Sequence, residues 1–187
     1  MVSAVLDKSK IENFDEDVVF VERFLAGDQA AFESIYAKYY DRVLAIAKGI
    51  LLNTEEATDA LQEIFTLVYR HLGRFDRRSR FSTWLFRVAV NRSIQEARKH
   101  KNRWRMVELH EAVAQAAPES SAEGDPKVQE ALAKMQPGDR ALLTLFYWQE
   151  LSLQEIAASL NCGTNAAKTR LYRARERFRA LYEGEIV

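Results

Sequence analysis

Apolar residues recur at intervals of three and four along most of the chain, which is the spacing of amphipathic helices. Two runs of this kind cover residues 28–51 and 53–72, and a third covers about 82–103. Residue types that cap helix N-termini stand where these runs begin: Asp28, Asn53 or Thr54, and Ser82. No segment alternates in the period-two pattern of a strand, so we predict an all-α fold that opens with a compact helical bundle.

A change of composition divides the chain. Residues 112–126 are small, polar and acidic and include two prolines, as is typical of a flexible linker. Helical spacing resumes at about Lys127. We therefore predict two small helical domains, 1–104 and 127–187, joined by a flexible acidic linker at 105–126.

The second domain carries the signals of a helix-turn-helix. Ser152 and Glu155 have the spacing of a capping box at the start of its first helix. Ala157 is small enough to allow close approach of another helix, and Asn161 tolerates the positive φ that the turn requires. The second helix of the motif is expected to begin near Asn165.

The charged residues are unevenly distributed along the chain, although its net charge is zero. Residues 87–105 hold seven basic and one acidic side chain, and residues 165–181 hold six and one. Residues 1–33 hold eight acidic and three basic side chains, and residues 108–130 hold six and one. Two basic helices separated by an acidic tract predict two contact points on one polyanion.

The C-terminal basic helix suits a DNA groove. At about 100° per residue, its basic side chains flank an apolar stripe that includes Ala167, Leu171 and Ala174. Such a helix can lie in a major groove, with phosphates along both edges, although a solvated basic helix is the alternative. The candidate DNA contacts on it are Lys168, Thr169, Arg170, Tyr172, Arg173 and Arg177.

The helix expected at 82–103 places an aromatic residue among polar ones. Trp84 shares a face with Asn91 and Gln95, with Arg87 beside them, while the opposite face is apolar. A ring next to Asn and Arg suits a base displaced from a duplex. Taken by themselves, however, these residues favour packing of Trp84 against the preceding helix.

The motifs as a whole resemble the bacterial sigma-70 family. The segments "DALQEIF" and "LGRFDRRSRFSTWLFRVAVN" are similar to its regions 2.2 to 2.4, and "LSLQEIAASLNCGTNAAKTRLYRARERF" is similar to its region 4.2. The resemblance covers residues 20–104 and 127–183. It leaves no room for the family's middle domain, as in the extracytoplasmic-function (ECF) group.

The resemblance implies a role for each motif. A segment that binds the β′ subunit of core RNA polymerase would use Asp59, Gln62, Glu63 and Phe65, although a capped helix with an acidic face would look the same. The basic tail at 98–105 would hold phosphates, and the C-terminal basic helix would read the −35 element. The residues that would recognise the opened −10 element are Phe75, Arg77, Arg78, Arg80, Phe81, Trp84, Arg87 and Asn91.

The implied partners are core RNA polymerase, through its β′ and β subunits, promoter DNA and an anti-sigma factor. Two motifs depart from the family pattern. Gln95 stands where the family's "NxxID" has Asp, and "NAAKTR" stands where the family has "GTVKSR", with Asn165, Ala166 and Ala167 in its first three positions. These departures leave the promoter sequence open.

Other function classes have little support. The histidines His71, His100 and His110 lack the spacing of a metal site, and no glycine-rich phosphate loop is present, so we expect no metal, no cofactor and no enzymatic activity. Neither a signal peptide nor an apolar run of about 20 residues occurs, so we expect a cytoplasmic protein without membrane insertion. The alternatives are a helix-turn-helix regulator acting without core polymerase, and a helical adaptor that binds no DNA.

Overall fold

The structure, a computed structural model, describes residues 15–108 and 125–184, with 100–108 described by their backbone alone. These residues form helices and no strand, which confirms the predicted all-α class. The helices of the first unit are α2 (Asp17–Leu25), α3 (Gln29–Leu51), α4 (Thr54–His71), the 3₁₀ turn η1 (Leu72–Arg74) and α5 (Phe81–Glu108). Those of the second unit are α6 (Pro126–Lys134), α7 (Pro137–Leu143), the π-helical turn η2 (Thr144–Trp148), α8 (Leu153–Ser159) and α9 (Thr164–Glu183).

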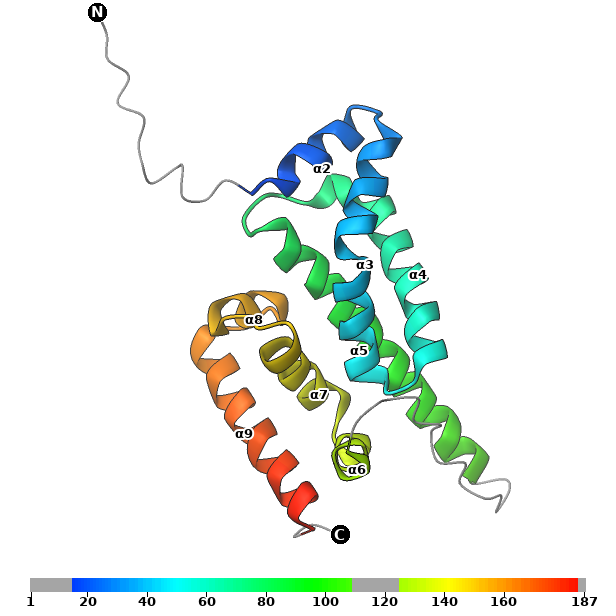
Figure 1. Cartoon of the computed structure of the whole chain (residues 1–187), viewed down its shortest axis with the longest axis vertical. Helices are drawn as coiled ribbons and strands as arrows, with labels where there is room; N and C mark the ends of the chain where they lie inside the picture. Colours follow the sequence, from blue (N-terminus) through cyan, green and yellow to red (C-terminus); the bar gives the residue numbers. More distant parts are fainter. Residues whose placement is uncertain (1–14, 109–124, 185–187) are drawn as a thin grey trace, which may run out of the picture.

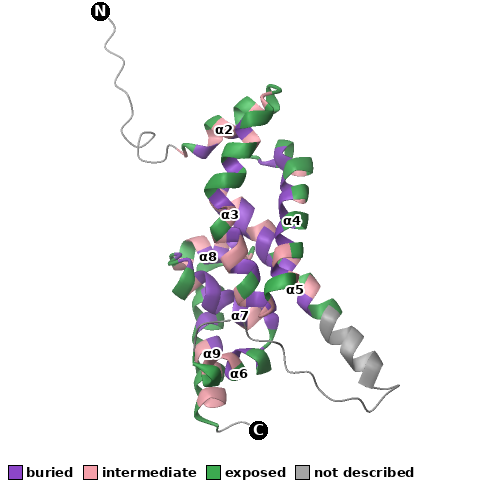
Figure 2. Ribbon diagram, turned by 45° about the vertical axis from the view of Figure 1, so that its right-hand side comes forward, coloured by how far each residue is buried: buried purple, intermediate pink, exposed green. Residues whose placement is uncertain are grey.

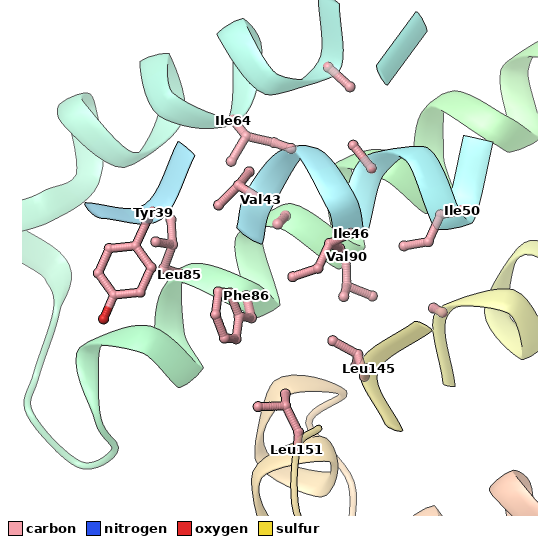
Figure 3. Close-up of a cluster of buried hydrophobic side chains, with 14 of the residues drawn as sticks. Tyr39, Val43, Ile46, Ile50, Ile64, Leu85, Phe86, Val90, Leu145 and Leu151 are labelled. Atoms are coloured by element: carbon pink, nitrogen blue, oxygen red, sulfur yellow. The ribbon is translucent and has the colours of Figure 1, made fainter. Parts of the chain in front are cut away.

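Helix α3 is the centre of the first unit, with α2, α4 and α5 packed around it (Figure 1). Apolar side chains from α3, α4 and α5 meet in its core, among them Val43, Ile46, Ile64, Leu85 and Val90, all completely buried (Figure 3). Each such side chain contributes about 1.5–3 kcal/mol when removed from water. The apolar stripes seen in the sequence therefore face one common core.

Two of the three caps predicted for the first unit are confirmed and one is wrong. Asp28 accepts a hydrogen bond from the Ala30 amide at 3.1 Å, and Asn53 accepts one from the Glu56 amide at 3.0 Å. Helix α5, in contrast, begins at Phe81, so Ser82 lies inside it and does not cap it. The amide of Phe81 donates to the carboxylate of Asp15 at 2.5 Å.

Helix α5 also runs further than expected. It ends at Glu108 and not near Arg103, so the first residues of the segment predicted as linker are helical. The remainder of that linker, residues 109–124, lies outside the described residues. The sequence of these last turns contains no Pro or Gly that would stop the helix.

The second unit contains the predicted helix-turn-helix, formed by α8 and α9. Ser152 and Glu155 make both hydrogen bonds of the capping box. Asn161 takes the left-handed conformation that the turn requires, with φ of 51°. Ala157 of α8 and Ala167 of α9 are buried. Small side chains on both helices allow the pair to pack closely.

The two units share one apolar core. Helices α7 and α8 and the turn η2 pack against α3 and α5, and Figure 2 shows buried residues running from one unit into the other. Leu145 and Leu151 of the second unit lie beside Ile46, Phe86 and Val90 of the first (Figure 3). The sequence predicted two domains but gave no indication of this packing between them.

A buried carboxylate ties α2 to α3. Asp17 is only 4% exposed, and it accepts hydrogen bonds from the Lys38 ammonium group at 2.5 Å and from the Tyr39 hydroxyl. Burial of the ring, together with the adjacent Asp17 carboxylate, raises the pKa of Tyr39 well above its usual value. The neutral phenol is therefore the form that the folded state favours.

We expect the Tyr39→Phe variant to be less stable by about 1–3 kcal/mol at neutral pH, because Asp17 loses a donor. Because folding raises the pKa of Tyr39, its stabilising contribution is complete below the unfolded value of about 10 and is lost as pH rises further. Urea unfolding between pH 7 and pH 11 should show a shallower alkaline loss of stability in Tyr39→Phe. The control is Tyr36→Phe, an exposed ring on the same helix, which should keep the wild-type profile.

Candidate nucleic-acid interface

Trp84 lies on α5 over two phenylalanines. Its ring centroid is 5.8 Å from that of Phe75 and 5.9 Å from that of Phe81. Phe75 is 7% exposed and Phe81 is completely buried, whereas Trp84 is half-buried. Of the three aromatic residues assigned to −10 recognition, only Trp84 offers a ring at the surface, and the two phenylalanines support it from below.

The expected polar stripe continues along α5. Asn91 and Gln95 are exposed, while Leu85, Phe86, Ala89, Val90 and Ser93 are buried on the opposite side, as predicted. Arg87 lies beside the stripe, half-buried, and its guanidinium group donates to the carbonyl of Ala158 from Nε at 3.0 Å and from Nη2 at 2.6 Å. The structure therefore brings Trp84 and Asn91 to one surface but engages Arg87 in a contact with α8.

The basic loop before α5 exposes its arginines. Arg77 forms an ion pair with Glu22 at 2.9 Å, and Arg78 forms one with Asp76 at 3.2 Å. Arg77 has a φ of 60°, a conformation that non-glycine residues rarely adopt. Both pairs are solvent-exposed, so each contributes little stability and can be exchanged for phosphate contacts.

The residues assigned to polymerase binding lie on α4. Asp59, Gln62 and Glu63 are exposed, but Phe65 is only 4% exposed and packs against the rings of Phe32 and Tyr36. Phe65 therefore shapes this face from inside. A shallow groove links the face to α5; the residues that line it are Gln62, Glu63, Thr66, Leu67, Arg70, Arg92 and Gln95.

Arg92 holds the two helices together at this groove. It forms ion pairs with Glu63 of α4 and with Glu96 of α5, the latter at 2.9 Å. The acidic candidate Glu63 and the polar stripe around Gln95 thus border the same groove, although they belong to two separate sequence motifs.

Helix α9 presents a continuous polar surface. All six candidate contacts are exposed: Lys168, Thr169, Arg170, Tyr172, Arg173 and Arg177. Tyr172 is 63% exposed, while the apolar stripe of Ala167, Leu171 and Ala174 is buried. Arg177 forms an ion pair with Asp139 of α7 at 2.5 Å. A buried stripe opposite an exposed basic face is the arrangement that a groove-binding helix requires.

Family comparisons identify both units. The family described as Sigma-70 region 2 matches residues 35–103, and the one described as Sigma-70, region 4 matches residues 126–178. The chain is 33% identical to the ECF RNA polymerase sigma factor SigW of Bacillus subtilis over 85% of this chain and 92% of that protein. The chain belongs to the sigma-70 family, in its ECF group.

Other relatives agree. The chain is 30% identical to the ECF RNA polymerase sigma-E factor of Escherichia coli, over 86% of this chain and 91% of that one. The solved structure of CnrH in complex with the cytosolic domain of CnrY has the same fold, with a TM-score of 0.67, 22% identity and coverage of 91% of this chain and 99% of that one. The sigma factor RpoE of Bartonella quintana, solved in complex with the anti-sigma factor NepR, matches with a TM-score of 0.61 and 21% identity. The match covers 81% of this chain and 96% of that one.

Membership of this family makes the chain a transcription initiation factor and not an enzyme. Among the residues that the structure describes, no group of His, Cys, Asp and Glu could hold a metal ion. Within the same residues, no helix has the length and apolar character to cross a bilayer.

Two long-range contacts that position the functional helices of this sigma factor could not be predicted from its sequence motifs. Asp15 accepts a hydrogen bond from the amide of Phe81, 66 positions later in the chain, and so fixes the first turn of α5, which carries Trp84. Arg42 of α3 donates to the side chain of Gln149, 107 positions later, at 3.0 Å. Neither residue belongs to a local motif. For Asp15 the available signal was the concentration of acidic residues near the N-terminus, and for Arg42 there was none.

We expect Asp15→Ala to lower the stability of the sigma factor by about 1 kcal/mol, because the amide of Phe81 loses its acceptor. The start of α5 should also fray, which would increase hydrogen exchange at the amides of 81–84. Asp41→Ala, at an exposed position on α3, is the matched control and should leave this exchange unchanged. Equal protection of 81–84 in Asp15→Ala and wild type would show that another group fixes this turn.

Proposed function

We propose that this chain is a dissociable promoter-specificity subunit of RNA polymerase. It joins the core enzyme, reads the −35 element as duplex DNA with α9, and holds a base of the opened −10 element on α5. The observation that carries the proposal is the pairing, in one chain, of an exposed basic helix-turn-helix face with an exposed aromatic and amide face on a second helix.

The −10 face is suited to a single strand. Trp84 supplies a π-surface, Asn91 supplies a donor and an acceptor, and Arg77, Arg78 and Arg80 lie in the adjacent exposed loop. Opening a duplex costs on the order of 1.4 kcal/mol per base step, and stacking on an aromatic ring returns about 1–3 kcal/mol per base. A few captured bases therefore offset local opening only with help from the polymerase. Phe75 and Phe81 take part as buried supports of Trp84.

The −35 face is suited to duplex DNA. Arg170, Arg173 and Arg177 follow one edge of α9, and Lys168 follows the other, so phosphates can be bound on both sides of a groove. Thr169 and Tyr172 point between these edges. They are the side chains that we assign to base edges.

For core polymerase we assign the exposed face of α4. Asp59, Gln62 and Glu63 are its polar contacts, and buried Phe65 keeps the helix in place against α3. The proposed partners on the polymerase are the β′ and β subunits. This assignment rests on the match of "DALQEIF" to the family motif and on the exposure of its polar side chains.

We also propose an anti-sigma protein as a regulatory partner and the cytoplasm as the place of action. The solved relatives support the first of these, since CnrH is in complex with the cytosolic domain of CnrY and the Bartonella quintana factor is in complex with an anti-sigma factor. The proposal as a whole is tested by transcription with purified core polymerase on a promoter library. No gain in initiation at any start site would refute it, and tight duplex binding without polymerase would favour a self-sufficient regulator.

We expect Trp84→Ala to slow open-complex formation about five- to hundredfold, which corresponds to the loss of about 1–3 kcal/mol of stacking. Binding to core polymerase should be unchanged, because α4 is intact. Permanganate footprinting on duplex and pre-melted templates measures the effect, and pre-melting should rescue it. The Trp84→Phe variant keeps a ring and should retain most of the rate. An equal defect on both templates would contradict the role given to Trp84.

We expect Arg173→Ala to weaken polymerase binding about tenfold at promoters that carry a −35 element, since a positive edge of α9 is removed. Electrophoretic mobility shifts over a salt series should show a slope smaller by about 1, as for the loss of one phosphate contact. Arg179→Ala, near the C-terminal end of the same helix, is the control and should bind like wild type. A loss of the same size on templates without a −35 element would argue against this assignment.

A further inference from the structure

The two halves of α9 differ in how their basic side chains are engaged. Three cations of the first half form no ion pair with the described part of the chain: Lys168, Arg170 and Arg173. In the second half, Arg177 pairs with Asp139 of α7 at 2.5 Å, and Arg179 pairs with Glu176 at 3.5 Å. Uncompensated positive charge on this exposed surface is therefore concentrated towards the start of α9.

Arg177 lies on the same edge of α9 as two of the free cations. At about 100° per residue, Arg170, Arg173 and Arg177 fall within about 60° of one another around the helix. Arg177 is one helical turn beyond Arg173, and its side chain is 56% exposed. By position and exposure it would be the third cation in a row along a DNA backbone. Its ion pair with Asp139 distinguishes it from the other two.

Asp139 is held in place by the packing of α7. It lies in the first turn of that helix, and its side chain is only 15% exposed. The next residue, Arg140, is buried, and its Nη1 donates to the carbonyls of Leu132 and Met135 at 3.3 and 3.4 Å. These hydrogen bonds fasten the start of α7 to the end of α6. The carboxylate of Asp139 is therefore a negative charge at a fixed place beside α9.

The second half of α9 is fixed as well. The Tyr182 hydroxyl donates at 3.2 Å to the carboxylate of Asp125, which caps α6. The ammonium group of Lys127 lies 5.2 Å from the centre of the Tyr182 ring. Helix α9 begins beside α8 and ends near α6, and it packs against α7 between them (Figure 1). The position of α9 against α6 and α7 thus keeps the side chain of Arg177 within reach of Asp139.

From these contacts we infer that Asp139 limits the DNA-binding edge of α9 to Arg170 and Arg173, because its carboxylate compensates the cation that would extend this edge. A phosphate at Arg177 would have to replace the carboxylate, and the nearby negative charge of Asp139 would repel it. The inference rests on the proposed function, since it takes α9 as the helix that binds duplex DNA. It gives α7, which carries none of the candidate DNA contacts, a residue that sets the sequence-independent affinity.

The test removes the charge of Asp139 and keeps its shape. In Asp139→Asn an amide of the same size replaces the carboxylate, so Arg177 is released while α7 keeps a polar side chain in its first turn. Glu130→Gln is the matched control, because it changes the net charge by the same amount and releases Lys134, its partner on α6 at 3.0 Å. Arg177→Ala, alone and combined with Asp139→Asn, shows whether the effect of Asp139 passes through Arg177.

Affinity is measured on the full chain without polymerase, by fluorescence anisotropy with a fluorescein-labelled duplex of random sequence over a salt series. Asp139→Asn should bind about three- to tenfold more tightly than wild type at about 50 mM salt. The slope of log affinity against log salt concentration should steepen by about 0.9, as for one additional phosphate contact. Glu130→Gln should match wild type in affinity and slope. In the Arg177→Ala background, Asp139→Asn should bring no gain.

The inference is overturned if Asp139→Asn binds the duplex no more tightly than wild type, undetectable binding included, or if its gain persists in the Arg177→Ala background. Weaker binding by Asp139→Asn would show instead that Asp139 orients Arg177 towards DNA. Arg173→Ala, measured alongside, separates this result from the proposed function. A loss of affinity in Arg173→Ala without a gain in Asp139→Asn would refute the inference alone. Unchanged affinity in Arg173→Ala would refute the assignment of α9 to duplex DNA.

Discussion

Burial of one face of α5 is the constraint on which the rest of the structure depends. Leu85, Phe86, Ala89 and Val90 are removed from water between α3 and α4 on one side and the second unit on the other. Because helical periodicity is fixed, burying this face turns Trp84, Asn91 and Gln95 outward. The core thus determines which side chains of α5 are available to a nucleic acid. The hydrogen bond from the Phe81 amide to Asp15 determines where α5, and with it this exposed face, begins.

In the second unit, burial of one helix face likewise decides which side chains are exposed, and here the exposed side chains are basic. Small residues let α8 and α9 approach, and the buried stripe of α9 leaves its basic edges in solvent. Charge is therefore concentrated on surfaces while the chain as a whole is neutral. Local fields of this kind govern association with a polyanion more strongly than the total charge does.

Continuity of the core across the two units gives the free sigma factor a conformation of its own. Leu145 and Leu151 complete a cluster that begins in α3 and α5, and Arg87 and Arg42 satisfy acceptors of the second unit. These contacts join side chains from segments more than 70 positions apart, so they fix how the two units pack in this structure.

The sequence by itself determined the features that depend on neighbours a few residues apart. These are the all-α class, the caps at Asp28 and Asn53, the helix-turn-helix with Asn161 in its turn, and the place of Trp84 on the polar stripe of its helix. Helical repeats and caps are local, so hydrophobic periodicity and residue type suffice to predict them. The family resemblance then supplied the functional assignment of the motifs.

Only the tertiary structure decided the contacts between distant segments. Capping of α5 by Asp15 and not Ser82, burial of Phe75 and Phe81 beneath Trp84, and the contact of Arg87 with Ala158 all join residues that no local pattern relates. The close approach of Gly49 to Thr144 is of the same kind. Such contacts depend on how helices pack in space, and packing is fixed by the shapes of both partners at once, which a single stretch of sequence does not contain.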